Sequence, residues 1–163
     1  MDARRLGLCA LCSIALASCQ ASSSEVDRRL IGSWTCVGQP ASGGTGPVGY
    51  VEMLTTSDGR FSSLSSASSS AGPGSVKLVG ISSGTWSSDG KSYTETAQAF
   101  DLHYAEENGA PVSPERLVAL QDAANQTMLR TTPFSIESLS PQAYTLADDE
   151  IRIFCERRKI PGP

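Results

Sequence analysis

The sequence predicts an all-β domain with one helix, arranged as an eight-stranded antiparallel up-and-down barrel. Three observations support this prediction. Short apolar or β-branched runs recur from Leu30 onward and are separated by turn residues at regular spacing. Asp58-Gly59 and Asp89-Gly90 are residue pairs favoured in tight hairpins. Residues 113–130 have the apolar spacing of a helix. Many antiparallel strands with short links favour a closed barrel.

The strands follow one another with two interruptions. They are predicted, in chain order, at Leu30–Val37, Val48–Thr55, Arg60–Leu64, Val76–Trp86, Ser92–Tyr104, Thr131–Leu139, Ala143–Leu146 and Ile151–Arg157. The segment Leu64–Ser75 is predicted to be a loop, because it consists mainly of serine, alanine and glycine. Alternation in the fifth strand shifts phase near Gln98, which indicates a bulge or a change of face.

The second interruption is the helix predicted within residues 113–130. Ser113 is a favourable N-cap and Pro114 suits the first helical position. One face carries Leu117, Leu120, Ala124 and Met128. We expect this amphipathic helix to pack against the barrel or to close one of its ends.

The N-terminus is predicted to be an export signal. Arg4 and Arg5 precede an apolar stretch over residues 6–17, which is shorter than the roughly 20 residues that a spanning helix needs. Two cleavage sites compete. Ala15-Leu16-Ala17 suits an ordinary signal peptidase, whereas Leu16-Ala17-Ser18-Cys19 resembles the lipobox of bacterial lipoproteins.

The number of cysteines favours the lipoprotein alternative. Of five cysteines, two leave with the signal, and Cys19, Cys36 and Cys155 remain. Exported proteins usually avoid an unpaired thiol, and a lipid on Cys19 leaves one pair. The resemblance implies a diacylglyceryl thioether on Cys19 and an acylated amino terminus, both holding the protein at a membrane. With Gln20 in the next position, it implies the periplasmic face of the outer membrane.

The chain therefore divides into a signal peptide (1–18), a flexible tether (19–29), a barrel domain (30–158) and a short tail (159–163). Removing 18 of the 163 residues leaves 145, which is enough for one domain with a core. The net charge changes from −4 to −5, because the signal contains two arginines and one aspartate. This acidic balance argues against a nucleic-acid partner.

A disulfide is predicted between the first and last strands. Trp34 and Cys36 lie on one face of the first strand, and Ile153 and Cys155 lie on one face of the last. A closed barrel pairs these two strands, which brings the cysteines within bonding distance. We expect the bond to be structural, because a catalytic dithiol more often has C-x-x-C spacing.

A sequence pattern spread over most of residues 30–157 resembles bacterial lipocalin-like proteins. Its segments are Gly32-Ser33-Trp34, Asp58-Gly59-Arg60-Phe61, Gly84-Thr85-Trp86, Phe134–Ser140 and Ile151–Cys155. The resemblance implies that Trp34 plugs the closed end of the barrel, with a cavity for a small apolar ligand at the other end. Arg157 and Arg158 are both candidates for the basic residue that caps this tryptophan. The predicted helix precedes the sixth strand, whereas lipocalins carry theirs after the last.

The barrel interior is expected to be partly empty. Eight strands leave room either for a core of side chains or for one small ligand. The chain has few aromatic residues, and many strand positions are Ser, Gly, Thr or Ala. The residues expected to line the interior and to contact a ligand are Trp34, Tyr50, Met53, Phe61, Leu78, Ile81, Tyr93, Phe100, Leu102, Phe134 and Ile136.

Nothing in the sequence predicts an enzyme, a metal site or a cofactor. His103 is the single histidine, and it shares a strand face only with Asp101. No serine lies in a nucleophile motif, and no glycine-rich loop precedes a helix.

Three functions are compatible with this sequence. The first is a lipid-anchored envelope protein that binds a small apolar or amphiphilic ligand. The second is an interaction module that inhibits a secreted protease or lysozyme, and the third is a purely structural envelope lipoprotein. A protein partner is not identified by the sequence.

Overall fold

The structure is a computed structural model that describes residues 27–42, 48–69 and 74–159. Cys19, the predicted signal peptide and residues 160–163 of the predicted tail lie outside the described residues. The strands are β1 (Gly32–Pro40), β2 (Val48–Thr55), β3 (Arg60–Ser69), β4 (Val76–Ser88), β5 (Ser92–Glu107), β6 (Ala110–Pro111), β7 (Thr131–Leu139), β8 (Ala143–Ala147) and β9 (Ile151–Arg157). The helices are η1 (Arg28–Leu30) and α1 (Pro114–Met128).

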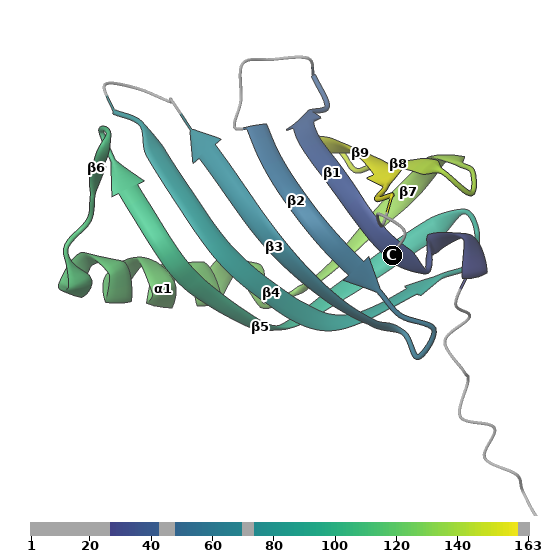
Figure 1. The fold of residues 1–163 in the computed structure, drawn as a ribbon, viewed down its shortest axis with the longest axis horizontal. Coiled ribbons are helices and arrows are strands. Elements are labelled where there is room, and N and C mark those ends of the chain that lie inside the picture. Colours follow the sequence, from purple (N-terminus) through teal and green to yellow (C-terminus); the bar gives the residue numbers. More distant parts are fainter. Residues whose placement is uncertain (1–26, 43–47, 70–73, 160–163) are drawn as a thin grey trace, which may run out of the picture.

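These strands form a closed antiparallel barrel. The described sheet has nine strands in the order β4-β3-β2-β1-β9-β8-β7-β5-β6, and β4 pairs with β5 as well. Only β6 lies outside this ring, so the barrel has eight strands (Figure 1). The predicted fold class is confirmed, and β2, β7 and β9 have the predicted bounds.

The two Asp-Gly pairs form the turns that the sequence predicts. Gly59 and Gly90 have φ angles of 75° and 84°, which glycine adopts without strain. In the second turn the Asp89 carboxylate accepts hydrogen bonds from the backbone N–H groups of Lys91 and Ser92 and from the Ser92 hydroxyl. The Ser92 amide is the largest cause of a pKa of Asp89 lowered to about 2.

Six strand ends differ from the prediction: β1 begins later, and β1, β3, β4, β5 and β8 end later than expected. The predicted loop from Leu64 is wrong up to Ser69, because β3 continues to that residue. Its backbone pairs with β2 as far as Ser68 and with β4 as far as Ser69, so hydrogen bonding on both sides determines its length. At the start of the first strand, β1 begins at Gly32. Leu30 ends η1, so this 3₁₀ turn contains two residues of the predicted tether.

Strand β5 contains the predicted irregularity and a second one. Gln98 is skipped between the pairs Gly84–Ala97 and Ser83–Ala99, so the phase shift near Gln98 is a bulge. His103 is skipped in the same way further along the strand. Each extra residue of this kind bends the strand. After it, every second side chain again faces the barrel interior. Strand β5 pairs with β7 only over residues 92–96 and with β6 only at Glu106 and Glu107, so residues 97–105 have a free edge on that side with no partner strand among the described residues.

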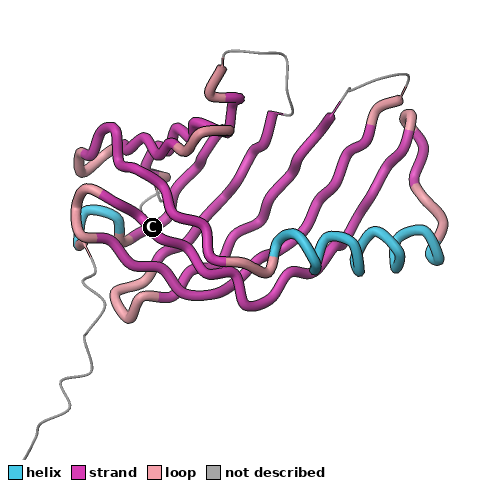
Figure 2. The backbone as a smooth tube through the Cα atoms, turned by 180° about the vertical axis from the view of Figure 1, so that it is seen from behind, coloured by secondary structure: helices cyan, strands magenta, loops and turns pink. Residues whose placement is uncertain are grey.

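Helix α1 lies along this free edge of β5 (Figure 2). Ser113 caps it by accepting a hydrogen bond from the Arg116 N–H group, and Pro114 occupies its first turn, as predicted. The Gln121 side chain accepts a bond from the Leu102 N–H group and donates one to the Phe100 carbonyl oxygen. The side-chain amide thus satisfies backbone groups that a neighbouring strand would otherwise satisfy.

Trp34 is fully buried in the core of the barrel. Its indole N–H group donates to the Leu30 carbonyl oxygen at 2.9 Å. The ring of Tyr144 meets it edge-on, with the ring centroids 4.6 Å apart. The guanidinium carbon of Arg157 lies 4.1 Å from the indole centroid. Arg157 therefore caps the tryptophan, whereas Arg158 forms an ion pair with Glu52 on the outside.

The predicted disulfide is present. Cys36 and Cys155 are direct partners in the β1–β9 ladder, and their sulfur atoms are bonded at 2.04 Å. The bond joins residues that are 119 positions apart, so it closes almost the whole domain into one loop. Constraining the unfolded chain in this way contributes at most about 4 to 5 kcal/mol.

Candidate ligand-binding cavity

A cavity of about 370 Å³ lies in the barrel, and Cys36, two residues along β1 from Trp34, is one of its lining residues. Ligand pockets of proteins have volumes of roughly 300–1,000 Å³, so the cavity suits one small molecule. Its apolar wall is formed by Val51, Met53, Phe134, Leu146, Ile151 and Ile153, together with the disulfide. Most of this wall comes from β2, β7, β8 and β9.

The opposite wall has small side chains, and these leave the space open. Ser63 and Ser65 of β3, Ser82 of β4 and Ala97 of β5 line the cavity. In the sheet register, Ser63 of β3 pairs with Met53 of β2 on one side and with Ser82 of β4 on the other. Two small side chains therefore lie next to one large side chain. The sequence predicted in general terms that small strand residues leave room inside.

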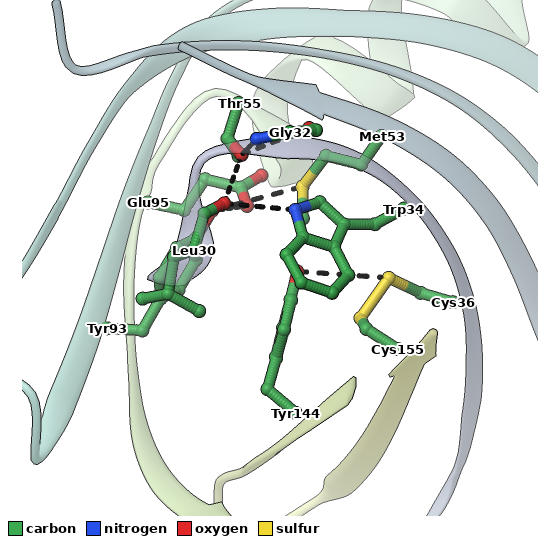
Figure 3. Close-up of a disulfide and its surroundings, with 10 residues drawn as sticks. All are labelled: Leu30, Gly32, Trp34, Cys36, Met53, Thr55, Tyr93, Glu95, Tyr144 and Cys155. Atoms are coloured by element: carbon green, nitrogen blue, oxygen red, sulfur yellow. Dashed lines mark hydrogen bonds between the residues drawn. A yellow bond between two sulfur atoms is a disulfide. The ribbon is translucent and has the colours of Figure 1, made fainter. Parts of the chain in front are cut away.

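Among the described residues, Glu95 of β5 places a carboxyl group on the inner wall of the cavity. The Tyr93 hydroxyl lies 3.3 Å from its Oε2 atom and 3.9 Å from the Met53 sulfur, so it can donate to either (Figure 3). Removal from water disfavours the charged carboxylate and raises the pKa of Glu95 to about 7, while the bond from Tyr93 acts in the opposite direction. Glu95 is therefore partly ionised near neutral pH.

The mouth of the cavity carries charges of both signs. Arg130 follows the end of α1, and Asp148 and Glu150 belong to the turn between β8 and β9. Met128, in the last turn of α1, also lines the cavity. With Glu95, the lining contains three carboxyl groups and one guanidinium group.

Nine of the eleven residues expected to line the interior fall into three groups. Met53 and Phe134 line the cavity. Trp34, Phe61 and Tyr93 are buried in the core, and Ile136 packs against that core. Leu78, Phe100 and Leu102 occupy inward register positions but are not among the lining residues of this cavity.

Tyr50 and Ile81 do not line the interior, which corrects the expectation. Their side chains are 44% and 41% exposed. On β2 the inward residues are Val51 and Met53, and a residue three positions from Met53 must lie on the other face. On β4 the inward positions beside Ile81 are occupied by Gly80 and Ser82, both of which are buried.

Sequence reasoning missed Glu95 and the charged residues of the mouth. Glu95 lies two positions after the buried Tyr93, so alternation alone places it on the inner face. That spacing was the available signal. For Arg130, Asp148 and Glu150 the sequence contains no comparable signal, because their position follows from where the turns meet in three dimensions.

The remaining chemistry of the described residues is sparse. Nε2 of His103 lies 3.6 Å from Oδ2 of Asp101, and both side chains are more than half exposed. Residues 27–42, 48–69 and 74–159 contain no cluster of three or more His, Cys, Asp or Glu side chains suited to a metal ion. None of the helices in these ranges has the length and apolar content needed to cross a membrane.

No family model and no curated protein matches the sequence. The cavity, the anchor motif and the chemistry of the residues around them are therefore the features from which a function is inferred.

Proposed function

We propose that the protein is a non-enzymatic, lipid-anchored protein of a bacterial cell envelope that binds one small apolar or amphiphilic molecule inside its barrel. The observation that carries the proposal is the barrel cavity, which has an apolar wall, a wall of small residues and an open mouth. Burial of apolar ligand surface supplies affinity of about 25 cal/mol per Å² before the costs of binding.

The membrane anchor is the second part of the proposal. The basic start, the apolar stretch and the segment Leu16–Cys19 support lipidation. Because Cys36 and Cys155 are bonded to each other, Cys19 is the remaining cysteine of the mature chain under this reading. The intact mass of the mature protein tests it. A chain that begins at Cys19 and carries added acyl mass supports the anchor, and an unmodified chain that begins at Ser18 contradicts it.

Ligand binding is tested with 4-phenylbutan-1-ol, a neutral amphiphile, by titration calorimetry of the protein in mild detergent against a detergent blank. Ser63→Leu places a larger side chain in the cavity, because Ser63 lines it and is 8% exposed. Ser62→Leu is the matched control, since Ser62 is exposed on the outer face of the same strand. We expect Ser63→Leu to weaken binding at least tenfold and Ser62→Leu to leave it within twofold.

Absence of binding, or binding that Ser63→Leu leaves unchanged in a folded protein, contradicts the proposal. Near-ultraviolet circular dichroism establishes whether each variant is folded. If Ser63→Leu does not fold, Ala97→Val supplies a smaller volume change at the same cavity, because Ala97 is also a lining residue.

A further inference from the structure

The cavity contains a carboxyl group that no basic side chain of the described residues neutralises. Each ion pair of the described residues joins other groups, and the polar contact of Glu95 is the hydroxyl of Tyr93. A carboxylate withdrawn from water without a cationic partner is costly to the folded state. A glutamine of similar shape would keep the Tyr93 bond without this cost.

The groups around Glu95 do not supply the missing positive charge. Tyr93 on β5 and Tyr144 on β8 are neutral, and burial raises the pKa of both phenols. Arg157 on β9 is committed to the indole of Trp34 and to the carbonyl oxygens of Arg29, Ile31 and Pro141.

The charged groups at the mouth add to the negative potential. Asp148 and Glu150 outnumber Arg130 there, and the net charge of the chain is −4. Asp148 accepts hydrogen bonds from the backbone N–H groups of Glu150 and Ile151, so its carboxylate is fixed in the turn. An anionic ligand would meet like charges both at the entrance and at Glu95, whereas a cation would be attracted along the same path.

We infer that the ligand is an amphiphilic amine, whose ammonium group pairs with the Glu95 carboxylate while its apolar part contacts Val51, Phe134 and Ile153. This inference rests on the proposed function and names the chemical class of its ligand. An ammonium group donates the hydrogen bonds that the carboxylate oxygens accept, and a charge-assisted bond is stronger than a neutral one. The ring of Phe134 is an additional favourable surface for a cation.

The test compares three ligands that share one skeleton: 4-phenylbutylamine, 4-phenylbutan-1-ol and 4-phenylbutyrate. At pH 8, where Glu95 is mostly ionised and the amine is protonated, we expect the amine to bind at least tenfold more tightly than the alcohol. The carboxylate ligand should bind weakest. Between pH 8 and pH 5.5 the affinity for the amine should fall, because protonation of Glu95 removes its charge.

Two variants locate the effect. Glu95→Gln should weaken binding of the amine at least tenfold, change binding of the alcohol less than threefold, and abolish the pH dependence. Glu156→Gln is the matched control, because Glu156 is an exposed residue of β9 outside the cavity, and it should bind all three ligands like the wild type.

The outcomes separate this inference from the proposed function. Equal affinities for amine and alcohol, or tightest binding of the carboxylate, would overturn the amine class while leaving ligand binding intact. A preference for amine that survives Glu95→Gln would do the same. Binding of none of the three ligands would overturn both. If Glu95→Gln does not fold, the comparison of amine and alcohol on the wild type decides alone.

Discussion

The guanidinium group of Arg157 covers the indole ring of Trp34 at 4.1 Å and thereby joins the last strand of the barrel to the first. It also donates to three carbonyl oxygens, those of Arg29, Ile31 and Pro141, at 2.6–2.8 Å. One side chain therefore holds η1, the start of β1 and the turn between β7 and β8 together. This cluster, called the floor below, lies next to Cys36, which lines the cavity.

Replacing Arg157 with Ala should destabilise the protein by about 2 to 4 kcal/mol, because several charge-assisted bonds and a cation–π contact are lost. Urea denaturation measures the change. Arg158→Ala is the control, since the Arg158–Glu52 pair lies on the surface and should contribute about 0 to 1 kcal/mol. Equal effects of the two substitutions would contradict the capping role of Arg157.

Gly32→Ala should also destabilise the floor. A Cβ atom at Gly32 would lie 2.2 Å from a terminal nitrogen of Arg157, and the φ angle of 142° disfavours any side chain. We expect a loss of about 1 to 3 kcal/mol in urea denaturation. Gly49→Ala is the matched control in β2, because a Cβ atom there meets nothing within 4 Å. A Gly32→Ala variant as stable as the control would show that Arg157 moves aside without cost.

Removal of the disulfide should cost about 2 to 5 kcal/mol. The double variant Cys36→Ala/Cys155→Ala removes the bond without leaving a free thiol at either position. Its urea midpoint should match that of the reduced wild type, and reducing agent should not change it further. A reductant effect of similar size in both proteins would show that the stabilisation has another source.

Stability should fall as pH rises through the range in which Glu95 ionises. The pKa of Glu95 is raised by burial from 4.5 to about 7, so between these values the folded state binds more protons than the unfolded state. The unfolding free energy therefore declines from about pH 4.5 to pH 7, by about 3 kcal/mol in total at 1.36 kcal/mol per pKa unit.

Glu95→Gln should remove this decline and be more stable than the wild type at pH 8, with little difference near pH 4.5. Urea denaturation at several pH values measures it. The lowered pKa of Asp89 does not interfere, because its contribution is lost only as pH falls below about 4. A wild-type protein whose stability rises steadily from pH 5 to pH 8 would contradict the environment assigned to Glu95.

The sequence predicts the barrel well because apolar and polar residues alternate along its strands. Its hairpin turns also contain residue pairs that favour tight turns. The disulfide also follows from the sequence, since a closed ring pairs the strand that carries Cys36 with the strand that carries Cys155, and the observed register makes them direct partners. The length of β3 does not follow, because Ser65–Ser69 has the composition of a loop and becomes a strand only through two neighbouring strands. Local propensity is overridden there by tertiary hydrogen bonding.

The cavity is harder to predict than the barrel, because its wall depends on strand register. Hydrophobicity favours Tyr50 and Ile81 as lining residues, although both face outward. The inner positions next to them include Ser82, which no hydrophobic criterion selects. Glutamate is usually found at exposed positions. For Glu95, only the spacing of two residues from Tyr93 indicates that it faces the barrel interior.

The most direct test of ligand binding inside the barrel is a crystal structure of the protein soaked with 4-phenylbutan-1-ol. We expect the phenyl ring to lie between Val51 and Ile153, above the disulfide. Ligand density confined to the outer surface, or a barrel in which side chains fill the cavity, would contradict the account.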